Sequence, residues 1–270
     1  MKLPGRSYFA AKTNANFPGN RERFGVPTIQ GIVLLFDAES GVPLAVLDSI
    51  EITILRTGAA TAAAAKKLAR SDSASATICG CGEQGRVQLE AIAGVLPIER
   101  AWAFDADPER ARSFAEARSR ELSIEVRPAA DLGAALRGSD VVVTCTPSRA
   151  PIVADADVLP GTFLAAVGAD SAGKQELDPA ILLRAKVVAD SIDQCVEIGE
   201  LQHAIREGFL RREDVYAELA EIVDGVKPGR TSPDEITVFD STGTALEDVA
   251  AAAAVYEKAI ALARGGRFVF

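Results

Sequence analysis

The sequence predicts an α/β protein with a Rossmann-type, doubly wound parallel sheet and a smaller, discontinuous α+β lobe. Three observations lead to this prediction. Short runs of Val, Ile, Leu and Ala alternate with helical segments from Ser75 onward. A glycine-rich turn joins the first of these runs to a helix. The earlier part of the chain has a different pattern, a β-hairpin followed by a long helix.

In the N-terminal part, the apolar runs 32–37 and 43–47 flank the turn-forming tripeptide Glu39-Ser40-Gly41, which predicts the hairpin. The alanine-rich segment 51–69 predicts the long helix. At the other end of the chain we expect a closing helix over residues 247–263. The last four residues, Arg267-Phe268-Val269-Phe270, are then expected to return as a strand to the N-terminal sheet.

The middle of the chain predicts the parallel sheet. Its apolar strands are expected at 76–79, 100–104, 124–126, 141–145, 163–167, 186–189 and 236–239. Helices are expected at 84–95, 109–121 and 132–136. Short apolar runs separated by helices are typical of a parallel sheet that is covered on both faces.

The bulk composition excludes several classes of protein. The 270 residues suffice for one large or two modest domains, and 48% hydrophobic and 25% charged residues are typical of a soluble globular protein. The net charge of −9 argues against a nucleic-acid groove, which needs a basic stripe. No apolar run is long enough to span a bilayer, and the first residues do not resemble a signal peptide. We expect neither nucleic acid nor a membrane as a partner.

Cysteine and histidine content narrows the chemistry. We interpret Cys79, Cys81, Cys145 and Cys195, which lack the spacing of metal ligands, as reduced packing residues of a cytoplasmic protein without a metal site. His203 is the only histidine, so we expect neither Ser-His-Asp nor Cys-His catalysis nor a multi-histidine metal site, unless His203 alone carries one. We expect it to be solvated or packed in a helical segment, 197–206. Proton transfer must then use Asp, Glu, Lys or Tyr.

The strongest functional motif contains three glycines. Gly80, Gly82 and Gly85 form G-x-G-x-x-G directly after an apolar strand and at the start of a helix. In a dinucleotide site, the first glycine permits a tight turn, the second lets the pyrophosphate approach, and the third lets the helix pack closely. The N–H groups of Glu83 and Gln84 are then expected to face the pyrophosphate. The alternative is an ordinary glycine-rich βα loop.

Asp105 closes the next strand, 20 residues after Gly85. A carboxylate in this position can accept hydrogen bonds from both ribose hydroxyls of NAD and would repel the 2′-phosphate of NADP. We therefore expect NAD as the cofactor. Asp105 or Asp107 can alternatively cap the helix that begins near Pro108. Asp107 suits that cap better, which leaves Asp105 for the ribose.

Motifs outside the glycine turn extend over nearly the whole chain. They include Ala11-Lys12-Thr13, Gly199-Glu200-Leu201, and residues 16–20, 27–31, 51–53, 56–60, 144–148, 167–170, 174–177 and 239–243. Together they resemble the ornithine cyclodeaminase/mu-crystallin family, which also contains amino-acid dehydrogenases and cyclic-imine reductases. The resemblance implies an NAD-dependent enzyme that transfers hydride at Cα of a small amino or cyclic imino acid through an imine. A non-catalytic protein of the mu-crystallin type, which binds a nucleotide or small ligand, is the alternative.

The resemblance also implies roles for single residues. Lys12 matches a lysine that contacts substrate and is an expected catalytic residue, because its ammonium can hold a carboxylate or polarise an imine. Arg56 and Thr242 match further substrate contacts. The residues that match contacts to NAD are Thr28, Arg56, Thr146, Val167, Gly168, Lys174 and Ser241. Asp170 follows the strand 163–167 at a Gly-Ala turn, beyond the carboxyl end where ligands bind, and is the expected proton shuttle.

Each of these residues also has a structural alternative. Lys12 can be a solvated surface lysine, and Asp170 can be a turn residue that caps the next segment. Arg56 can form an ion pair with Glu51 or Asp48. The polar residues matched to NAD contacts can each be turn or capping residues.

The ends of the chain depart from the family pattern. Family members usually begin with a helical segment and an arginine that helps bind the substrate carboxylate, whereas this sequence starts just before the Lys12 motif. It also lacks the long C-terminal extension of ornithine cyclodeaminases, and Arg6 is the candidate to replace the missing arginine.

The predicted domains are a substrate-binding and dimerisation lobe, 1–57 and 247–270, and an NAD-binding Rossmann domain, 58–246. The sheet of the terminal lobe is too small to stand alone, and its edges need cover. We therefore expect a homodimer built through this lobe.

Overall fold

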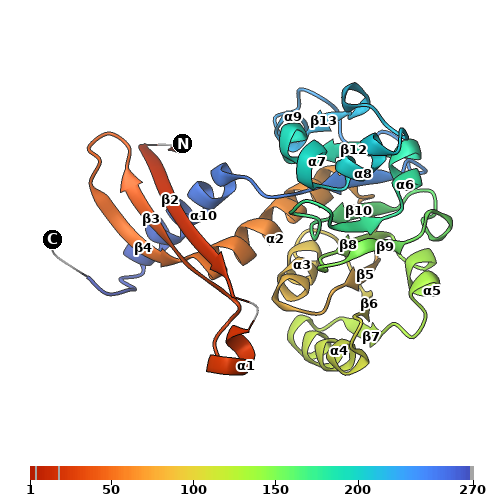
Figure 1. Cartoon of the computed structure of the whole chain (residues 1–270), viewed down its shortest axis with the longest axis horizontal. Coiled ribbons are helices and arrows are strands. Elements are labelled where there is room, and N and C mark those ends of the chain that lie inside the picture. Colours follow the sequence, from red (N-terminus) through yellow and green to blue (C-terminus); the bar gives the residue numbers. More distant parts are fainter. Residues whose placement is uncertain (4, 18, 268–270) are drawn as a thin grey trace. The chain divides into compact units, whose positions relative to one another are not determined.

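The computed structural model describes residues 1–3, 5–17 and 19–267 and divides the chain into two units. Unit 1 consists of Met1–Arg56 and Thr244–Phe270, and unit 2 consists of Thr57–Gly243. The expected boundaries, 57/58 and 246/247, lie one and three residues from these. Figure 1 shows that unit 1 combines a sheet from the start of the chain with a helix from its end.

Unit 1 contains an antiparallel sheet with the strand order β1-β2-β3-β4. Its elements are β1 (Lys2–Leu3), β2 (Arg6–Asn16), α1 (Asn20–Phe24), β3 (Ile29–Asp37), β4 (Pro43–Asp48), the first part of α2 (Ser49–Leu68) and α10 (Ala245–Ala261). The expected hairpin is confirmed, with Val33 opposite Leu47. The long strand β2 was not expected. Arg267 lies in no strand, and residues 268–270 of the expected C-terminal strand lie outside the described residues.

One face of the unit 1 sheet packs on α10. Tyr8, Val33 and Leu35 are fully buried and form a cluster with Ala252 and Ala253 of α10. The Tyr8 hydroxyl donates a hydrogen bond of 2.6 Å to Glu257, so this buried polar group has a partner. The same alternation that buries these side chains leaves those of the neighbouring positions on the opposite face.

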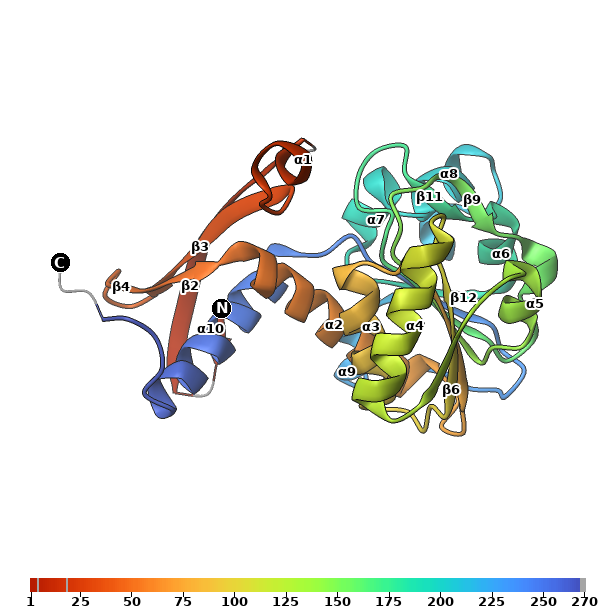
Figure 2. The same cartoon turned by 90° about the horizontal axis from the view of Figure 1, so that it is seen from below.

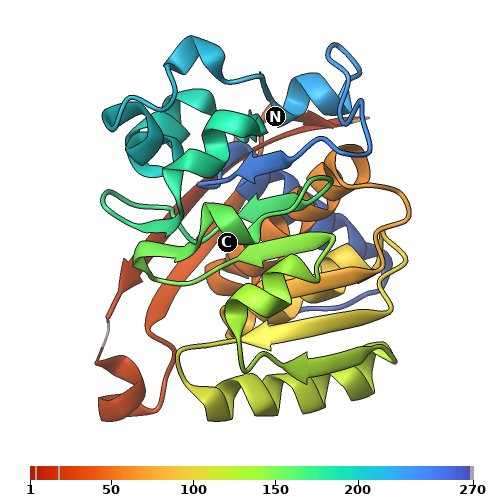
Figure 3. The ribbon, with the colours of Figure 1, turned by 90° about the vertical axis from the view of Figure 1, so that its right-hand side faces the viewer.

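Unit 2, all of whose residues are described, contains a parallel sheet of eight strands in the order β13-β12-β14-β10-β8-β5-β6-β7. These are β5 (Ser75–Cys79), β6 (Arg100–Phe104), β7 (Glu125–Pro128), β8 (Val141–Thr144), β10 (Phe163–Ala166), β12 (Lys186–Ala189), β13 (Ala217–Glu218) and β14 (Thr237–Asp240). Figure 3 shows the strands from β14 (blue) to β7 (yellow-green) stacked in this order. The predicted fold class is confirmed.

Helices cover both faces of this sheet. One face is covered by α2, α3 (Glu83–Ala93), α4 (Pro108–Leu122) and α9 (Leu219–Val223), and the other by α5 (Leu132–Arg137), α6 (Pro179–Arg184), α7 (Ile192–Ile198) and α8 (Leu201–Arg206). The central strand β8 shows the alternation, because Val141 and Val143 belong to the first core and Val142 to the second. Figure 2 shows α3 and α4 side by side on the first face.

The strands and helices expected in unit 2 are present, with ends within two residues of the expected ones. The helical segment expected at 197–206 is interrupted at Gly199, between α7 and α8. A short parallel pair outside the main sheet, β9 (Arg149–Val153) and β11 (Gln175–Leu177), was not expected. Among the helices that the structure describes, none is long and apolar enough to cross a membrane.

Candidate active site

The strand order of unit 2 reverses between β5 and β8. From β5 the chain moves through β6 to β7 on one side and then returns to β8 and β10 on the other. Ligands of such sheets bind beyond the carboxyl ends of the strands at this switch point. The glycine turn follows β5, Thr146 follows β8, and Gly168 follows β10, so these predicted cofactor contacts lie on neighbouring loops.

In the glycine turn after β5, the central residue, Gly82, has free space beside its backbone. Gly80 has φ +107°, and a Cβ there would lie 2.8 Å from the carbonyl oxygen of Cys145. A Cβ on Gly85 would lie 2.0 Å from the carbonyl oxygen of Gly80, so α3 packs against the turn only without a side chain. A Cβ on Gly82 would meet nothing within 4 Å. Because Gly82 directly precedes α3, whose first N–H groups have no helical partners, an anion can approach there.

The two residues after Gly82 begin α3. Glu83 lies on the helix surface, where its carboxylate accepts a hydrogen bond of 3.1 Å from Arg86. The side-chain oxygen of Gln84 is buried. What these residues can offer an anion is therefore their backbone N–H groups.

Asp105 lies directly after β6 and contacts the glycine turn. Its Oδ2 accepts from the Cys81 N–H at 2.9 Å and its Oδ1 from the Asp107 N–H at 3.0 Å, so it is not left free as expected. Each carboxylate oxygen can accept a second hydrogen bond, which leaves capacity for ribose hydroxyls. Arg110 lies 3.8 Å from Oδ1. The expected cap is confirmed, because Asp107 accepts from the Glu109 N–H at the start of α4.

A single carboxylate holds the loops after β8 and β10. Glu176 of β11 is fully buried, and its Oε1 accepts from the Thr146 N–H at 2.6 Å and from the Thr146 hydroxyl at 2.7 Å. Its Oε2 accepts from the Gly168 N–H at 3.0 Å. The hydroxyl of Thr146 therefore donates inward, and toward a cofactor it can only accept. Val167, between β10 and Gly168, is buried and donates its N–H to Thr144.

Asp170 lies at the surface of the same loop and is paired. Its side chain is 52% exposed, and Oδ1 accepts from Nζ of Lys174 at 2.6 Å. Nζ of Lys174 also donates to the carbonyl of Gly168 at 3.3 Å. Lys174 thus links the predicted proton shuttle to the backbone of the loop.

The loop that carries Asp170 and Lys174 is supported by α8. The side-chain oxygen of Gln202 accepts from the Gly173 N–H at 3.0 Å, and Nε2 of His203 lies 2.7 Å from the Lys174 carbonyl oxygen. Nδ1 of His203 lies 3.0 Å from the guanidinium of Arg206. A guanidinium only donates, so Nδ1 accepts and Nε2 donates to the carbonyl. The only histidine is therefore a packed support of this loop.

Ser241 and Thr242 follow β14 and contact Asp190, the residue after β12. Oδ2 of Asp190 accepts from the Ser241 hydroxyl at 2.9 Å and from the Gly243 N–H at 2.6 Å. Oδ1 accepts from the Thr242 hydroxyl at 3.4 Å. Ser241 and Thr242, both predicted to contact ligands, therefore donate their hydroxyl protons to Asp190. Their hydroxyl oxygens can still accept hydrogen bonds.

Unit 1 carries its own polar cluster, formed by β2, α2 and α10. Nζ of Lys12 donates to Thr53 at 2.5 Å and to Asp248 at 3.0 Å. Arg56 lies 3.0 Å from Glu247 and 3.4 Å from Asp248. Lys12 and Arg56 are mostly buried, so Lys12 is not a solvated surface lysine. The arrangement places two cations and two carboxylates in contact.

Three further expectations concern unit 1. The ion pairs of Arg56 are with α10 and not with Glu51 or Asp48, the partners considered from the sequence. Arg6 pairs with Asp37 of β3 at 3.0 Å, so its guanidinium already has a partner. Thr28 lies directly before β3, where its carbonyl accepts from the Phe17 N–H at 2.7 Å.

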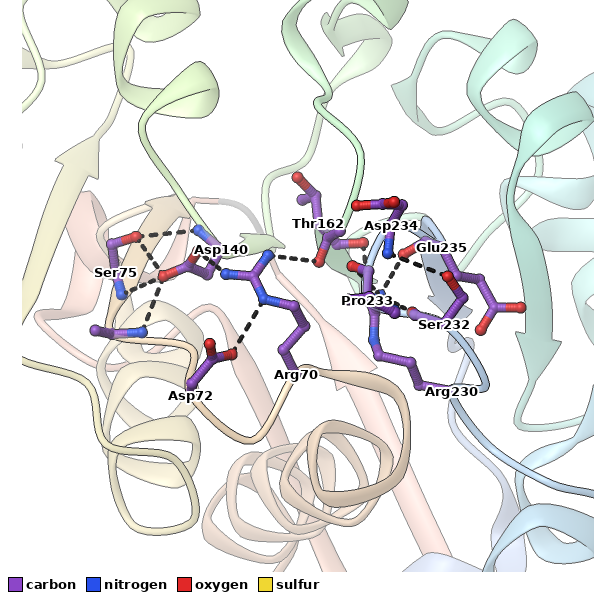
Figure 4. Close-up of polar contacts among 12 residues, drawn as sticks. Arg70, Asp72, Ser75, Asp140, Thr162, Arg230, Ser232, Pro233, Asp234 and Glu235 are labelled. Carbon is purple, nitrogen blue, oxygen red and sulfur yellow. Dashed lines mark hydrogen bonds and ion pairs between the residues drawn. The ribbon is translucent and has the colours of Figure 1, made fainter.

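A cavity of about 580 Å³ lies at the opposite, amino end of the unit 2 sheet, beside Arg70 and Arg230. Figure 4 shows how both arginines are engaged. Arg70 donates to Asp140 at 2.5 Å, and Asp140 accepts from the Ser75 hydroxyl at 2.7 Å. Arg230 donates to the carbonyl of Leu68 and to the hydroxyl of Thr237. These cations connect strand ends to α2, so this cavity is not the ligand site that we consider.

The cysteines of the site are unsuited to nucleophilic chemistry. All four are free thiols, and burial together with the Asp105 carboxylate raises the pKa of Cys81 to about 12. Burial also raises the pKa of Cys145 well above its usual range. Thiols with such pKa values stay protonated at neutral pH, and the thiolate is the reactive form. In the described part of the chain, no group of three or more His, Cys, Asp or Glu side chains is placed to hold a metal ion.

Sequence reasoning missed the carboxylates that organise these loops. They are Asp190, Glu176, Glu200, Asp240, Glu247 and Asp248. A usable indication existed for two of them, because Asp190 and Asp240 directly follow the apolar segments 186–189 and 236–239, which were expected to be buried strands. A charge in such a place needs a partner.

The chain is similar to known proteins over nearly its whole length. The model of the ornithine cyclodeaminase/mu-crystallin family matches residues 2–262. An alanine dehydrogenase of Archaeoglobus fulgidus is 42% identical over 264 residues, which cover 97% of this chain and 80% of that protein. The structure of Thermococcus litoralis Delta(1)-pyrroline-2-carboxylate reductase in complex with NADH and L-proline matches with a TM-score of 0.91 and 38% identity over 96% of this chain and 80% of that one.

An archaeal alanine dehydrogenase dimer with bound NAD matches with a TM-score of 0.92 and 42% identity over 97% of this chain and 81% of that one. These similarities extend over both units and confirm the resemblance predicted from the motifs. The chain belongs to the ornithine cyclodeaminase/mu-crystallin family.

Proposed function

We propose that this protein is an NAD-dependent oxidoreductase that transfers hydride between NAD and the Cα atom of a small amino or cyclic imino acid. The observation that carries the proposal is the open backbone at Gly82, between two glycines that no other residue can replace. Relatives that bind NAD or NADH support it. When bound, NAD supplies the acceptor or donor of the hydride.

The residues of the glycine turn fit this cofactor. In our proposal the N–H groups at the start of α3 bind the pyrophosphate, because they are unpaired and carry the positive end of the helix dipole. Asp105 binds the ribose hydroxyls through the acceptor capacity that Cys81 and Asp107 leave unused. The hydroxyl oxygens of Thr146 and Ser241 are assigned as acceptors toward the cofactor, together with contacts from Val167, Gly168 and Lys174.

Lys12 and Arg56 are assigned to the substrate carboxylate. Nζ of Lys12 has three protons, and two are donated to Thr53 and Asp248, which leaves one for a ligand. Glu247 and Asp248 hold both cations in place and keep the cluster neutral while no substrate is bound. Thr28 and Thr242 remain further proposed contacts, the first to the cofactor and the second to the substrate.

Asp170 is assigned as the proton shuttle. Oxidation of an amine to an imine requires that the nitrogen lose a proton, and reduction of an imine requires the reverse. Asp170 is the exposed carboxylate that follows β10 at the carboxyl edge, and Lys174 orients it at 2.6 Å. Dehydrogenation, imine reduction and cyclodeamination all need these same steps, so the proposal covers the three reactions.

The test separates cofactor binding from turnover. The backbone of Gly82 is extended (φ −89°, ψ −163°), which any residue can adopt, and its Cβ position is open. Gly82→Val should therefore fold with an unchanged melting temperature and lose NAD binding, measured by calorimetric titration, and Gly82→Ala should show a smaller loss. Equal NAD affinity of wild type and both variants would contradict the assignment of the turn.

Turnover is measured by NADH absorbance with alanine, ornithine, lysine, proline and a cyclic imine. We expect turnover of at least one of them. NAD binding without any turnover would instead favour a non-catalytic protein of the mu-crystallin type, which binds a nucleotide or small ligand.

We also propose that the protein is a homodimer, assembled through the outer face of the unit 1 sheet. This face is apolar and exposed: Phe9 is 45%, Ile32 46% and Val46 62% exposed. Phe9 stacks on Phe36 at 4.7 Å across β2 and β3, which extends the apolar surface over neighbouring strands. Apolar patches of this kind mark association sites. A dimeric archaeal relative supports the proposal.

The four free thiols favour a reducing compartment. We therefore propose that the protein works in the cytoplasm.

A further inference from the structure

Glu176 is a buried carboxylate without a cationic partner. Its side chain has no solvent exposure, and in the part of the chain that the structure describes no Lys, Arg or His lies within ion-pair distance of it. Three donors surround it instead, namely the N–H and hydroxyl of Thr146 and the N–H of Gly168. Burial raises the pKa of Glu176 above its usual range, against these hydrogen bonds. A charge is retained in such a place only where specific bonds compensate its desolvation.

The three donors belong to two different loops. Thr144 and Ala166 are direct neighbours at the ends of β8 and β10, and the loops with Thr146 and Gly168 leave the sheet just beyond them. The Glu176 carboxylate bridges these loops. A Cβ on Gly168 would lie 2.5 Å from both of its oxygens, so the loop backbone is packed directly against the charge.

Two further buried carboxylates, those of Glu200 and Asp240, fix the backbone that carries Glu176. Glu200, which is 1% exposed, accepts from the backbone N–H of Glu176 at 2.7 Å and from that of Leu177 at 3.2 Å. Asp240, fully buried at the end of β14, accepts from the N–H of Glu200 at 3.1 Å and from that of Leu201 at 3.0 Å. Each carboxylate therefore fixes the backbone of the segment that carries the next one.

We propose that Glu176 is a positioning residue for the cofactor, and that its carboxylate sets the spacing of the Thr146 and Gly168 loops on which NAD rests. The inference depends on the proposed function, since it concerns the same site. Glu176 does not touch the cofactor in this role. It acts through the two loops, with Glu200 and Asp240 holding it in register.

The test compares Glu176→Gln with Asp178→Asn. A glutamine side chain has one acceptor oxygen and one N–H₂ group, so one end presents a donor to an N–H that needs an acceptor. One of the two loops should then shift, and the Kd for NAD should rise by at least about tenfold. Asp178 is the matched control, because it is a carboxylate of the same segment that accepts one N–H, from Ala180 at 3.0 Å, at the cap of α6.

Glu176→Gln is expected to melt earlier than wild type, whereas Asp178→Asn should melt close to it, because asparagine also caps helices. Only Glu176→Gln should bind NAD more weakly, measured by calorimetry well below either melting temperature. Unchanged NAD affinity of a folded Glu176→Gln variant, with normal binding by wild type, overturns this inference and leaves the proposed function intact. Failure of wild type to bind NAD overturns both.

Should Glu176→Gln not fold, Glu200→Gln decides the question. It leaves all three bonds of the Glu176 side chain in place and disturbs only its backbone. We expect a smaller rise of the Kd in the same direction, and a wild-type Kd in that variant overturns the inference.

Discussion

Single carboxylates, more than cations, position the loops at the carboxyl edge of the unit 2 sheet. Asp105 holds the glycine turn, Glu176 holds the loops after β8 and β10, and Asp190 holds the loop after β14. In each case a backbone N–H is the donor. Hydrogen bonds with one charged partner are shorter and stronger than neutral ones, which suits them to fixing loops that carry no regular structure.

Asp105 should determine the choice between NAD and NADP. Wild type is expected to prefer NAD, because a 2′-phosphate would lie against the carboxylate. Asp105→Asn removes this repulsion and leaves Arg110, now 3.8 Å from a neutral side chain, to attract the phosphate. The ratio of the two Kd values should therefore shift toward NADP by about tenfold or more.

Fluorescence titrations with NADH and NADPH measure this ratio. Asp107→Asn is the control, because asparagine also caps helices and the residue lies only two positions away. The same ratio in wild type and Asp105→Asn would mean that Asp105 does not bind the ribose.

Asp170 should determine turnover and little else. Asp170→Asn keeps the size of the side chain but removes the group that accepts a proton, so kcat should fall by roughly 10²- to 10⁴-fold. NAD affinity and the melting temperature should change little, since the glycine turn is untouched and the Asp170 side chain is half exposed. Asp214→Asn is the matched control, because Asp214 is also partly exposed and also paired with a basic neighbour, Arg211, at 2.7 Å. Normal turnover in Asp170→Asn would reduce Asp170 to a turn residue.

Strands and helices were predicted where their own sequences contain the pattern. The strands β5, β8, β10 and β14 are short, mostly apolar runs in which every residue is buried. Such runs can be recognised from the sequence alone. The strand β2 does not have it. Its inward positions, Tyr8, Ala10 and Lys12, end in a charge whose partners Thr53 and Asp248 come from α2 and α10.

The residues of the candidate site also fall into those that the sequence predicts and those that it does not. The three glycines and Asp105 were predictable, because strand, turn and helix follow one another within a short stretch of sequence. The role of Glu176 was not, because Thr146 lies 30 residues before it in the sequence, and the carboxylate meets Thr146 and Gly168 together only in the folded chain. The position of Asp105 directly after β6 was predicted, but its bonds to Cys81 and Asp107, which arise from the local fold, were not.

The buried Asp240 at the end of β14 should make the free energy of unfolding depend on pH. Burial raises the pKa of Asp240 from 3.8 to about 7, against the N–H bonds from Leu201 and Glu200. The folded state thus holds a proton up to about pH 7 that the unfolded chain releases near pH 4. Between these values the folded state binds more protons, so the free energy of unfolding should fall as pH rises, by about 1.4 kcal/mol per pH unit for this group.

Urea denaturation between pH 4.5 and 7 measures this slope. Asp240→Asn should make it shallower by about the same amount. Glu200, Asp190 and Cys195 are the titratable neighbours of Asp240, and burial raises the pKa of Glu200 in the same direction, so part of the slope should remain. Asp214→Asn should not flatten it, because the Arg211 contact lowers the pKa of Asp214. Parallel slopes in wild type and Asp240→Asn would contradict the prediction.

Assembly of the whole molecule should depend on the outer face of the unit 1 sheet. Val46→Glu places a charge on a face that is apolar and exposed in one chain, and burial of that charge in an interface is unfavourable. Light scattering at micromolar concentration should show a dimer for wild type and a monomer for this variant. Val226→Glu is the matched control, because Val226 is 72% exposed on unit 2. A monomeric wild type would rule out the proposed dimer.

Unit 1 is built from two segments that lie far apart in the sequence, and this has a consequence for biosynthesis. Its strands β2, β3 and β4 leave the ribosome before unit 2, whereas α10, which covers Tyr8, Val33 and Leu35, is translated only after all of unit 2. Unit 2 is continuous and can fold as soon as it is complete, while the nascent sheet still lacks its cover. Chains that stall or are cut before residue 245 therefore present an uncovered apolar sheet, the kind of surface that chaperones bind and that aggregates without them.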